Sequence, residues 1–81
     1  MTLEEQQYYE TYFDTFASDG WKQYINEIKE ILDSYRIEDI KDEKQLQYVK
    51  GERSALYRVL RFETGVKTAY DMILEREAKY D

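Results

Sequence analysis

Residues 20–35, GWKQYINEIKEILDSY, carry the pattern that decides the fold. Apolar side chains recur in this stretch at steps of one and three residues, and this spacing gathers them on one face of an α-helix. These positions are Trp21, Tyr24, Ile25, Ile28, Ile31, Leu32 and Tyr35. Mostly polar and charged residues fill the remaining positions, so the stretch predicts an amphipathic helix over about residues 20–35.

A longer helical segment follows residues 36–40, where the apolar period is lost. Asp42 and Gln45 have the spacing of an N-cap residue and its partner three positions later, which predicts a helix start near residue 43. Two apolar seams then run through residues 43–78: Leu46, Val49, Leu56 and Leu60, and Ala55, Val59, Phe62, Val66, Ala69 and Ile73. Because Gly in a helix interior costs about 1 kcal/mol relative to Ala, we expect a kink or a short break near Thr64–Gly65.

The N-terminal segment predicts a further helix over about residues 3–16. Thr2 and Glu5 form a capping box, in which each side chain accepts a hydrogen bond from the other residue's backbone. A dense aromatic stripe follows at Tyr8, Tyr9, Tyr12, Phe13 and Phe16. Ser18–Asp19–Gly20 reads as a break, with Ser18 or Asp19 capping the next helix.

The predicted fold is all-α: an antiparallel helical hairpin of residues 20–35 and 43–78, plus the N-terminal helix. We expect one domain over residues 1–81, in which 1–17 form an acidic, aromatic helix and 18–81 form the hairpin. A helix over 20–35 spans about 24 Å and one over 43–78 spans about 54 Å, so the first leaves Val66 and Ile73 uncovered. Phe13 and Phe16 could fold back over them, or a second copy could cover them; we predict at least a dimer.

Composition argues against catalysis. The chain has no Cys and no His, so it lacks the usual general base, the usual zinc ligand and any thiolate. Acid pairs at helical spacing, such as Glu27 with Glu30 and Asp71 with Glu75, are expected on solvated faces of a chain with 18 acids. We therefore expect no enzymatic activity, no catalytic residue, no metal site and no cofactor.

Charge is distributed unevenly along the chain, whose net charge is −6. Residues 1–20 contain five acids and no base, whereas residues 41–61 contain six bases and three acids. The basic segment is too mild to predict nucleic-acid binding, and we expect it to complement the acidic segment of the same chain or of a neighbouring one. No stretch is long and apolar enough to predict a membrane span, and residues 1–5 do not resemble a secretory signal.

Two groups of residues are candidates for protein binding. Nine tyrosines exceed what a core of this size can hide, and Tyr is enriched at binding surfaces. The predicted protein-binding residues are Tyr8, Tyr9, Tyr12, Phe13, Val66 and Ile73. Arg53 lies on the first seam, and two interpretations are open. Its aliphatic chain packs on the seam while its guanidinium reaches an acid near solvent, or it forms an ion pair with Glu27 or Glu30 of the facing helix that fixes how the two helices pair.

The chain also resembles the small acidic helical-hairpin proteins of podovirus-type tailed bacteriophages. Gly20–Trp21–Lys22 with Ile25, Glu27 and Ile28 carries part of the resemblance, and Ile40–Leu46 followed by Val49–Glu52, Leu56 and Leu60 carries the rest. It covers about residues 18–74. It implies a phage context and a non-enzymatic role, and no functional residue is carried over from it.

These observations predict a small virion-associated or assembly protein that packs its helices against other phage proteins or against itself. Its expected location is the virion or the host cytoplasm. The alternative is an acidic host-takeover factor, which binds and inhibits a host enzyme through the acids of residues 1–20.

Overall fold

The computed structural model describes residues 1–80, and the side chains of residues 1–79. Its elements are α1 (Leu3–Ala17), α2 (Asp19–Asp33), the short 3-10 helix η1 (Ile37–Asp39) and α3 (Glu43–Tyr80). The described residues contain no strand, so the all-α class and the three predicted helices are confirmed. The predicted domain extends to Asp81, which lies outside the described residues.

Both predicted helix starts are capped by the expected side chains. The Thr2 hydroxyl accepts a hydrogen bond from the Glu5 backbone N–H at 3.1 Å, and the Glu5 carboxylate accepts one from the Thr2 backbone at 3.4 Å. At the start of α3, the Asp42 carboxylate accepts a hydrogen bond from the Gln45 backbone N–H at 2.7 Å. These bonds satisfy backbone donors that a helix start leaves without partners.

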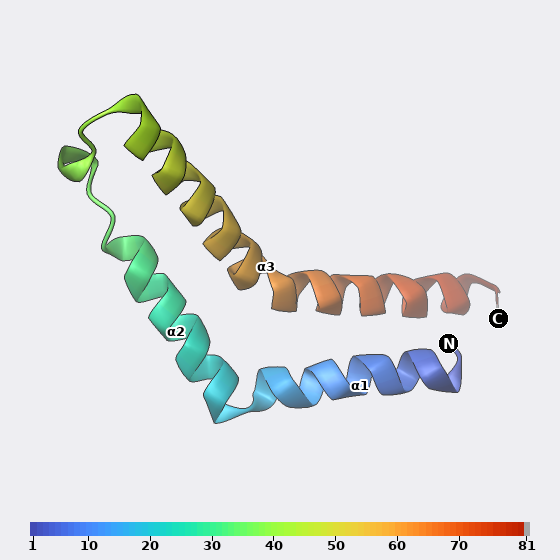
Figure 1. Ribbon diagram of the computed structural model, residues 1–81. Coiled ribbons are helices and arrows are strands. Elements are labelled where there is room, and N and C mark those ends of the chain that lie inside the picture. Colours follow the sequence, from blue (N-terminus) through green and yellow to red (C-terminus); the bar gives the residue numbers. More distant parts are fainter. Residues whose placement is uncertain (81) are drawn as a thin grey trace.

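A single residue, Ser18, separates α1 from α2. Its backbone is extended, and its hydroxyl donates to the Thr15 carbonyl at 2.6 Å and accepts from the Trp21 backbone N–H at 3.2 Å. Of the two predicted caps, Ser18 is therefore the one used, and Gly20 lies inside α2 rather than in a break. Because one extended residue makes the corner, α1 and α2 diverge and cannot pair along their lengths (Figure 1).

α3 is one unbroken helix that bends near its middle, where its colour passes from brown to orange (Figure 1). Its first half runs beside α2 and its second half runs beside α1, so the molecule is a V with two arms of two helices. The bend corresponds to a kink rather than a break. The start of α1 and the last turns of α3 meet at the tip of one arm, where the Met1 amino group pairs with Glu77.

The V shape leaves an unusually large surface for a chain of this length. The radius of gyration is 17.8 Å, whereas a compact domain of this length has about 12 Å. The accessible surface is 6782 Å² for a chain of 9.9 kDa, and a compact monomer of this mass exposes roughly 5200 Å². The surplus is therefore roughly 1600 Å².

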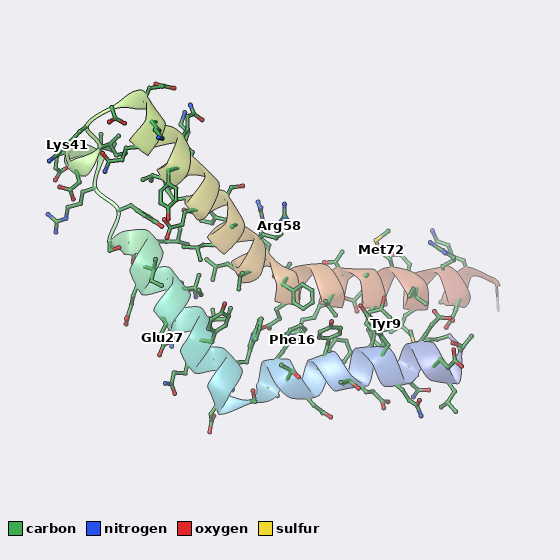
Figure 2. All side chains as sticks on the ribbon, viewed as in Figure 1. Tyr9, Phe16, Glu27, Lys41, Arg58 and Met72 are labelled. Atoms are coloured by element: carbon green, nitrogen blue, oxygen red, sulfur yellow. The ribbon has the colours of Figure 1, made fainter. Side chains whose placement is uncertain are left out.

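The core is small and lies mostly in the arm formed by α1 and α3. Tyr9, Phe16 and Val66 are buried together there, whereas Ile28 is the one buried residue of the α2 arm among the described residues. Figure 2 places Tyr9 and Phe16 between α1 and α3. The sequence left open whether the N-terminal helix or a second copy covers Val66 and Ile73. In the structure, α1 of the same chain folds back over them.

Candidate interaction surface

The structure brings the six predicted protein-binding residues together in the arm formed by α1 and α3. Tyr9 and Val66 are buried in the core, and three others, Tyr12, Phe13 and Ile73, are half-buried against it. Tyr8 alone is largely exposed, at 55%. Contact of these residues with a partner stays a prediction, and most of their surface is already used within the chain.

A polar contact ties the start of α2 to the middle of α3. The Trp21 indole N–H donates to a carboxylate oxygen of Glu63 at 2.9 Å, and the Lys67 ammonium lies 2.6 Å from the other oxygen. Glu63 and Lys67, four positions apart on α3, thus form an ion pair along the helix. The hydrogen bond from Lys67, followed by the one from Trp21, lowers the pKa of the Glu63 carboxyl below its usual range.

Glu63→Gln is expected to lower stability in a pH-dependent way. Because the folded-state pKa of Glu63 is lowered, its ionised form stabilises the fold fully above the unfolded-state pKa. This stabilisation is lost as pH falls through the folded-state pKa. The thermal midpoint of the variant, followed by circular dichroism, should lie below that of the wild type at neutral pH and approach it below about pH 4.

Glu75→Gln is the matched control, since Glu75 and Lys79 form a 3.9 Å pair whose side chains are both largely exposed. Such exposed pairs contribute little, so this variant should follow the wild type at both pH values. A midpoint difference for Glu63→Gln that is the same at neutral and acidic pH would contradict the assignment.

A shallow groove of about 340 Å³ lies between α1 and α3. Apolar and small side chains line most of it, and two arginines lie at its margin. We call it the arginine groove; its lining residues are Tyr8, Tyr9, Arg58, Arg61, Phe62, Gly65, Val66 and Ala69. Its composition suits a ligand that is partly apolar and carries negative charge.

The two arginines of this groove have no carboxylate partner in the described part of the chain. Neither Arg58 nor Arg61 has an acid three or four positions away on α3, where a helix would supply one. They are themselves three positions apart, a spacing at which like charges repel on a helix. Their charge is therefore available to a group from outside the chain.

Further basic residues continue this surface along α3. A second hollow, of about 320 Å³, is lined by Lys50, Arg53, Ser54, Tyr57 and Arg61, so it adjoins the arginine groove. The Arg53 guanidinium lies 5.9 Å from the centre of the Tyr57 ring. No ion pair between Arg53 and either predicted acid is found within residues 1–79, and Figure 2 places Glu27 on the outer side of α2.

At two positions of α3, Gly51 and Gly65, no neighbouring atom of the described chain requires a glycine. A Cβ placed on Gly51 or on Gly65 would meet nothing within 4 Å. On the same helix, the exposed fraction is 41% for Phe62 and 56% for Met72. Phe62 packs partly against Tyr12 and Phe16 of α1, but the space beside the two glycines is open, so they leave room for the backbone of a partner helix to approach.

The remaining features of the described residues concern metal ligands, a buried hydroxyl group and helix hydropathy. The described residues contain no group of three or more His, Cys, Asp or Glu side chains placed to hold a metal ion. The Tyr35 hydroxyl is buried without a hydrogen-bond partner, and burial, with Glu52 nearby, raises its pKa to about 12. It therefore stays protonated at neutral pH. Within residues 1–80, no helix has the length and apolar character that crossing a bilayer requires.

Comparison with known proteins gives no relative: no protein-family model, no curated protein and no solved structure matches the chain. The candidate surface therefore rests on its own geometry. Of the predicted protein-binding residues, Tyr8, Tyr9 and Val66 line the arginine groove. The sequence prediction missed Arg58 and Arg61, although the absence of acids three or four positions from either arginine was visible in the sequence.

Proposed function

We propose that the chain is a small non-enzymatic assembly protein that acts by packing its helices against other proteins. The observation that carries this proposal is the surface that the V-shaped fold leaves uncovered, which exceeds that of a compact monomer by roughly 1600 Å². Interfaces of standard size bury about 800 Å² on each partner, so the surplus is large enough for one.

The small core supports the same conclusion. Only Tyr9, Phe16, Ile28 and Val66 are buried among the described hydrophobic residues, and no large side chain there is fully buried. A chain that buries so little gains stability by covering more apolar surface with a partner, because buried apolar area is the main stabilising contribution. The resemblance of residues 18–74 to podovirus-type proteins adds the context of a virion-associated or assembly protein.

Mass spectrometry of purified particles tests this function directly. For a phage that encodes the chain, we expect it in mature particles or in assembly intermediates, in many copies at symmetric positions. Its absence from both, while it is present in the infected lysate, would overturn the proposal. An abundant phage enzyme that is not packaged is the control for contamination.

A second candidate, the host-takeover factor, is favoured by one observation. Glu4, Glu10 and Asp14 are exposed on α1 and form no ion pair within the described residues. A pull-down from host lysate tests it with the wild type and with a variant in which Glu4, Glu5 and Glu10 are replaced by Gln. Gln at position 5 also fits a capping box, so the fold should persist. A host partner that binds both forms equally, or no salt-sensitive partner, would contradict this candidate.

A further inference from the structure

We propose that the arginine groove is a docking site for α1 of a second copy of this chain. The face of α1 that would enter it, named here the acidic face, consists of Glu10 and Asp14 together with the exposed Leu3. This inference rests on the proposed function and deepens it, because it names one protein against which the helices pack.

The first argument is charge complementarity between two surfaces of the same chain. Among residues 1–79, Arg58 and Arg61 have no acid partner at the groove, and the acidic face of α1 has no basic partner. The sequence left open whether these charges meet within one chain or between chains. In the structure, Tyr9 and Phe16 of α1 face α3. The acidic face of α1 therefore points away from Arg58 and Arg61 of the same chain. The complementary pairing is thus available only between copies.

The second argument is the direction in which α3 bends. Long helices curve with their convex side towards solvent, because they wrap around a core. Figure 1 shows the partner helices of α3, α1 and α2, on its convex side, and no described helix on its concave side. Figure 2 shows Arg58 and Met72 on this concave side. Since Arg58 also lines the arginine groove, the groove reaches this uncovered side, and a helix docked in it would cover part of the concave side of α3.

The third argument is the apolar and small lining of the groove. Gly65 and Ala69 allow a helix backbone to approach, and Phe62 and Tyr8 offer exposed aromatic surface. The incoming α1 carries Leu3, which is 69% exposed and would be covered by this surface. An apolar contact with charged pairs at its margin is the usual organisation of a protein interface.

The net charge of −6 does not oppose this contact. Repulsion between whole chains acts over distances that physiological salt screens within about 8 Å. Arginine–carboxylate pairs at hydrogen-bond distance are screened far less, and they decide which surfaces meet.

A charge-swap experiment with the full chain tests the docking. One variant carries Arg58→Glu and Arg61→Glu, and the other carries Glu10→Lys and Asp14→Lys. In sedimentation equilibrium from micromolar to submillimolar concentration, the wild type should self-associate and each variant alone should do so about tenfold more weakly or not at all. A mixture of the two variants should associate again, because each groove then meets an α1 of opposite charge.

Lys29→Glu with Lys44→Glu is the matched control, since it changes the net charge by the same amount as the groove variant on exposed residues outside the groove. It should self-associate like the wild type. Circular dichroism of every variant establishes that the fold is retained; if a double variant does not fold, Arg61→Glu alone, paired with Asp14→Lys alone, takes its place in the same comparison.

A wild-type chain that sediments only as the 9.9 kDa monomer would overturn the docking, and so would a mixture that stays monomeric. If the chain is monomeric but present in virus particles, the groove serves another acidic protein and the proposed function stands. If it self-associates through the groove but is absent from particles and intermediates, the docking stands and the proposed function is wrong.

Discussion

Phe16→Ala is expected to unfold most of the chain at room temperature or to lower its thermal midpoint by more than about 12 °C. Phe16 is buried, at 5% exposure, and its ring contacts one aromatic ring on each of the three helices: Tyr12, Trp21 and Phe62. Truncating a buried Phe to Ala costs about 3–5 kcal/mol. A domain of this length has a total stability of about 4–12 kcal/mol, so the loss is a large part of the whole.

Urea and thermal unfolding, followed by far-ultraviolet circular dichroism, measure this effect. Tyr48→Ala is the control, because Tyr48 is an aromatic residue that is 71% exposed, and its stability should change by about 0.5 kcal/mol or less. A midpoint for Phe16→Ala within a few degrees of the wild type would show that Phe16 does not join the three helices.

The helices themselves could be predicted from the sequence because their signals are local. Thr2 with Glu5, and Asp42 with Gln45, place a side-chain acceptor three residues before the backbone donor that it satisfies, and the structure has both contacts. The apolar stripes likewise marked the faces that pack. Spacing along one helix is enough for these features, and no knowledge of the neighbouring helix is required.

The V shape could not be predicted from the sequence. It depends on the conformation of one residue, Ser18, and on whether α1 of the same chain or a second copy covers the C-terminal half of α3. A Ser–Asp–Gly sequence indicates a break, but it does not say that Ser18 alone turns the chain while Gly20 stays helical. Periodicity identified Val66 and Ile73 as residues that need a cover. It does not say whether the same chain or another supplies it, and here α1 of the same chain does.

The candidate site was only partly predictable for a related reason. Aromatic density drew attention to Tyr8, Tyr9 and Phe13, yet most of this surface is used by the core. The arginine groove depends on the unpaired charges of Arg58 and Arg61. In the sequence, the only sign of these unpaired charges is that no acid lies three or four positions from either arginine. Whether a distant acid pairs with them depends on the fold.

Ile28→Asp is expected to open the α2 arm while the arm of α1 and the second half of α3 stays closer to native. Ile28 is 4% exposed and is the one buried residue described in its arm, whereas Tyr9, Phe16 and Val66 lie in the other. A buried, unpaired carboxylate in place of Ile loses the apolar burial and adds a desolvation cost, so we expect a loss of about 3–5 kcal/mol.

Hydrogen–deuterium exchange measures where the loss falls. Peptides from residues 19–33 and 43–60 should exchange much faster in Ile28→Asp than in the wild type, and peptides from residues 3–17 and 62–79 should change less. Uniform acceleration over the whole chain would mean that the arms unfold as one unit, and unchanged exchange would mean that Ile28 is not buried.

The pH dependence of the same variant separates the charge from the lost packing. Burial would raise the pKa of the new carboxyl group, so its neutral form is the one tolerated in the fold. The destabilisation should therefore be smallest below the unfolded-state pKa of about 3.9 and should grow as pH rises through the folded-state value. Ile28→Asn removes the same apolar group without a titrating one, so its difference from the wild type should stay nearly constant over this range. An Ile28→Asp variant that parallels Ile28→Asn at every pH would show that position 28 is open to water, because only a desolvated carboxyl group shifts its pKa in this way.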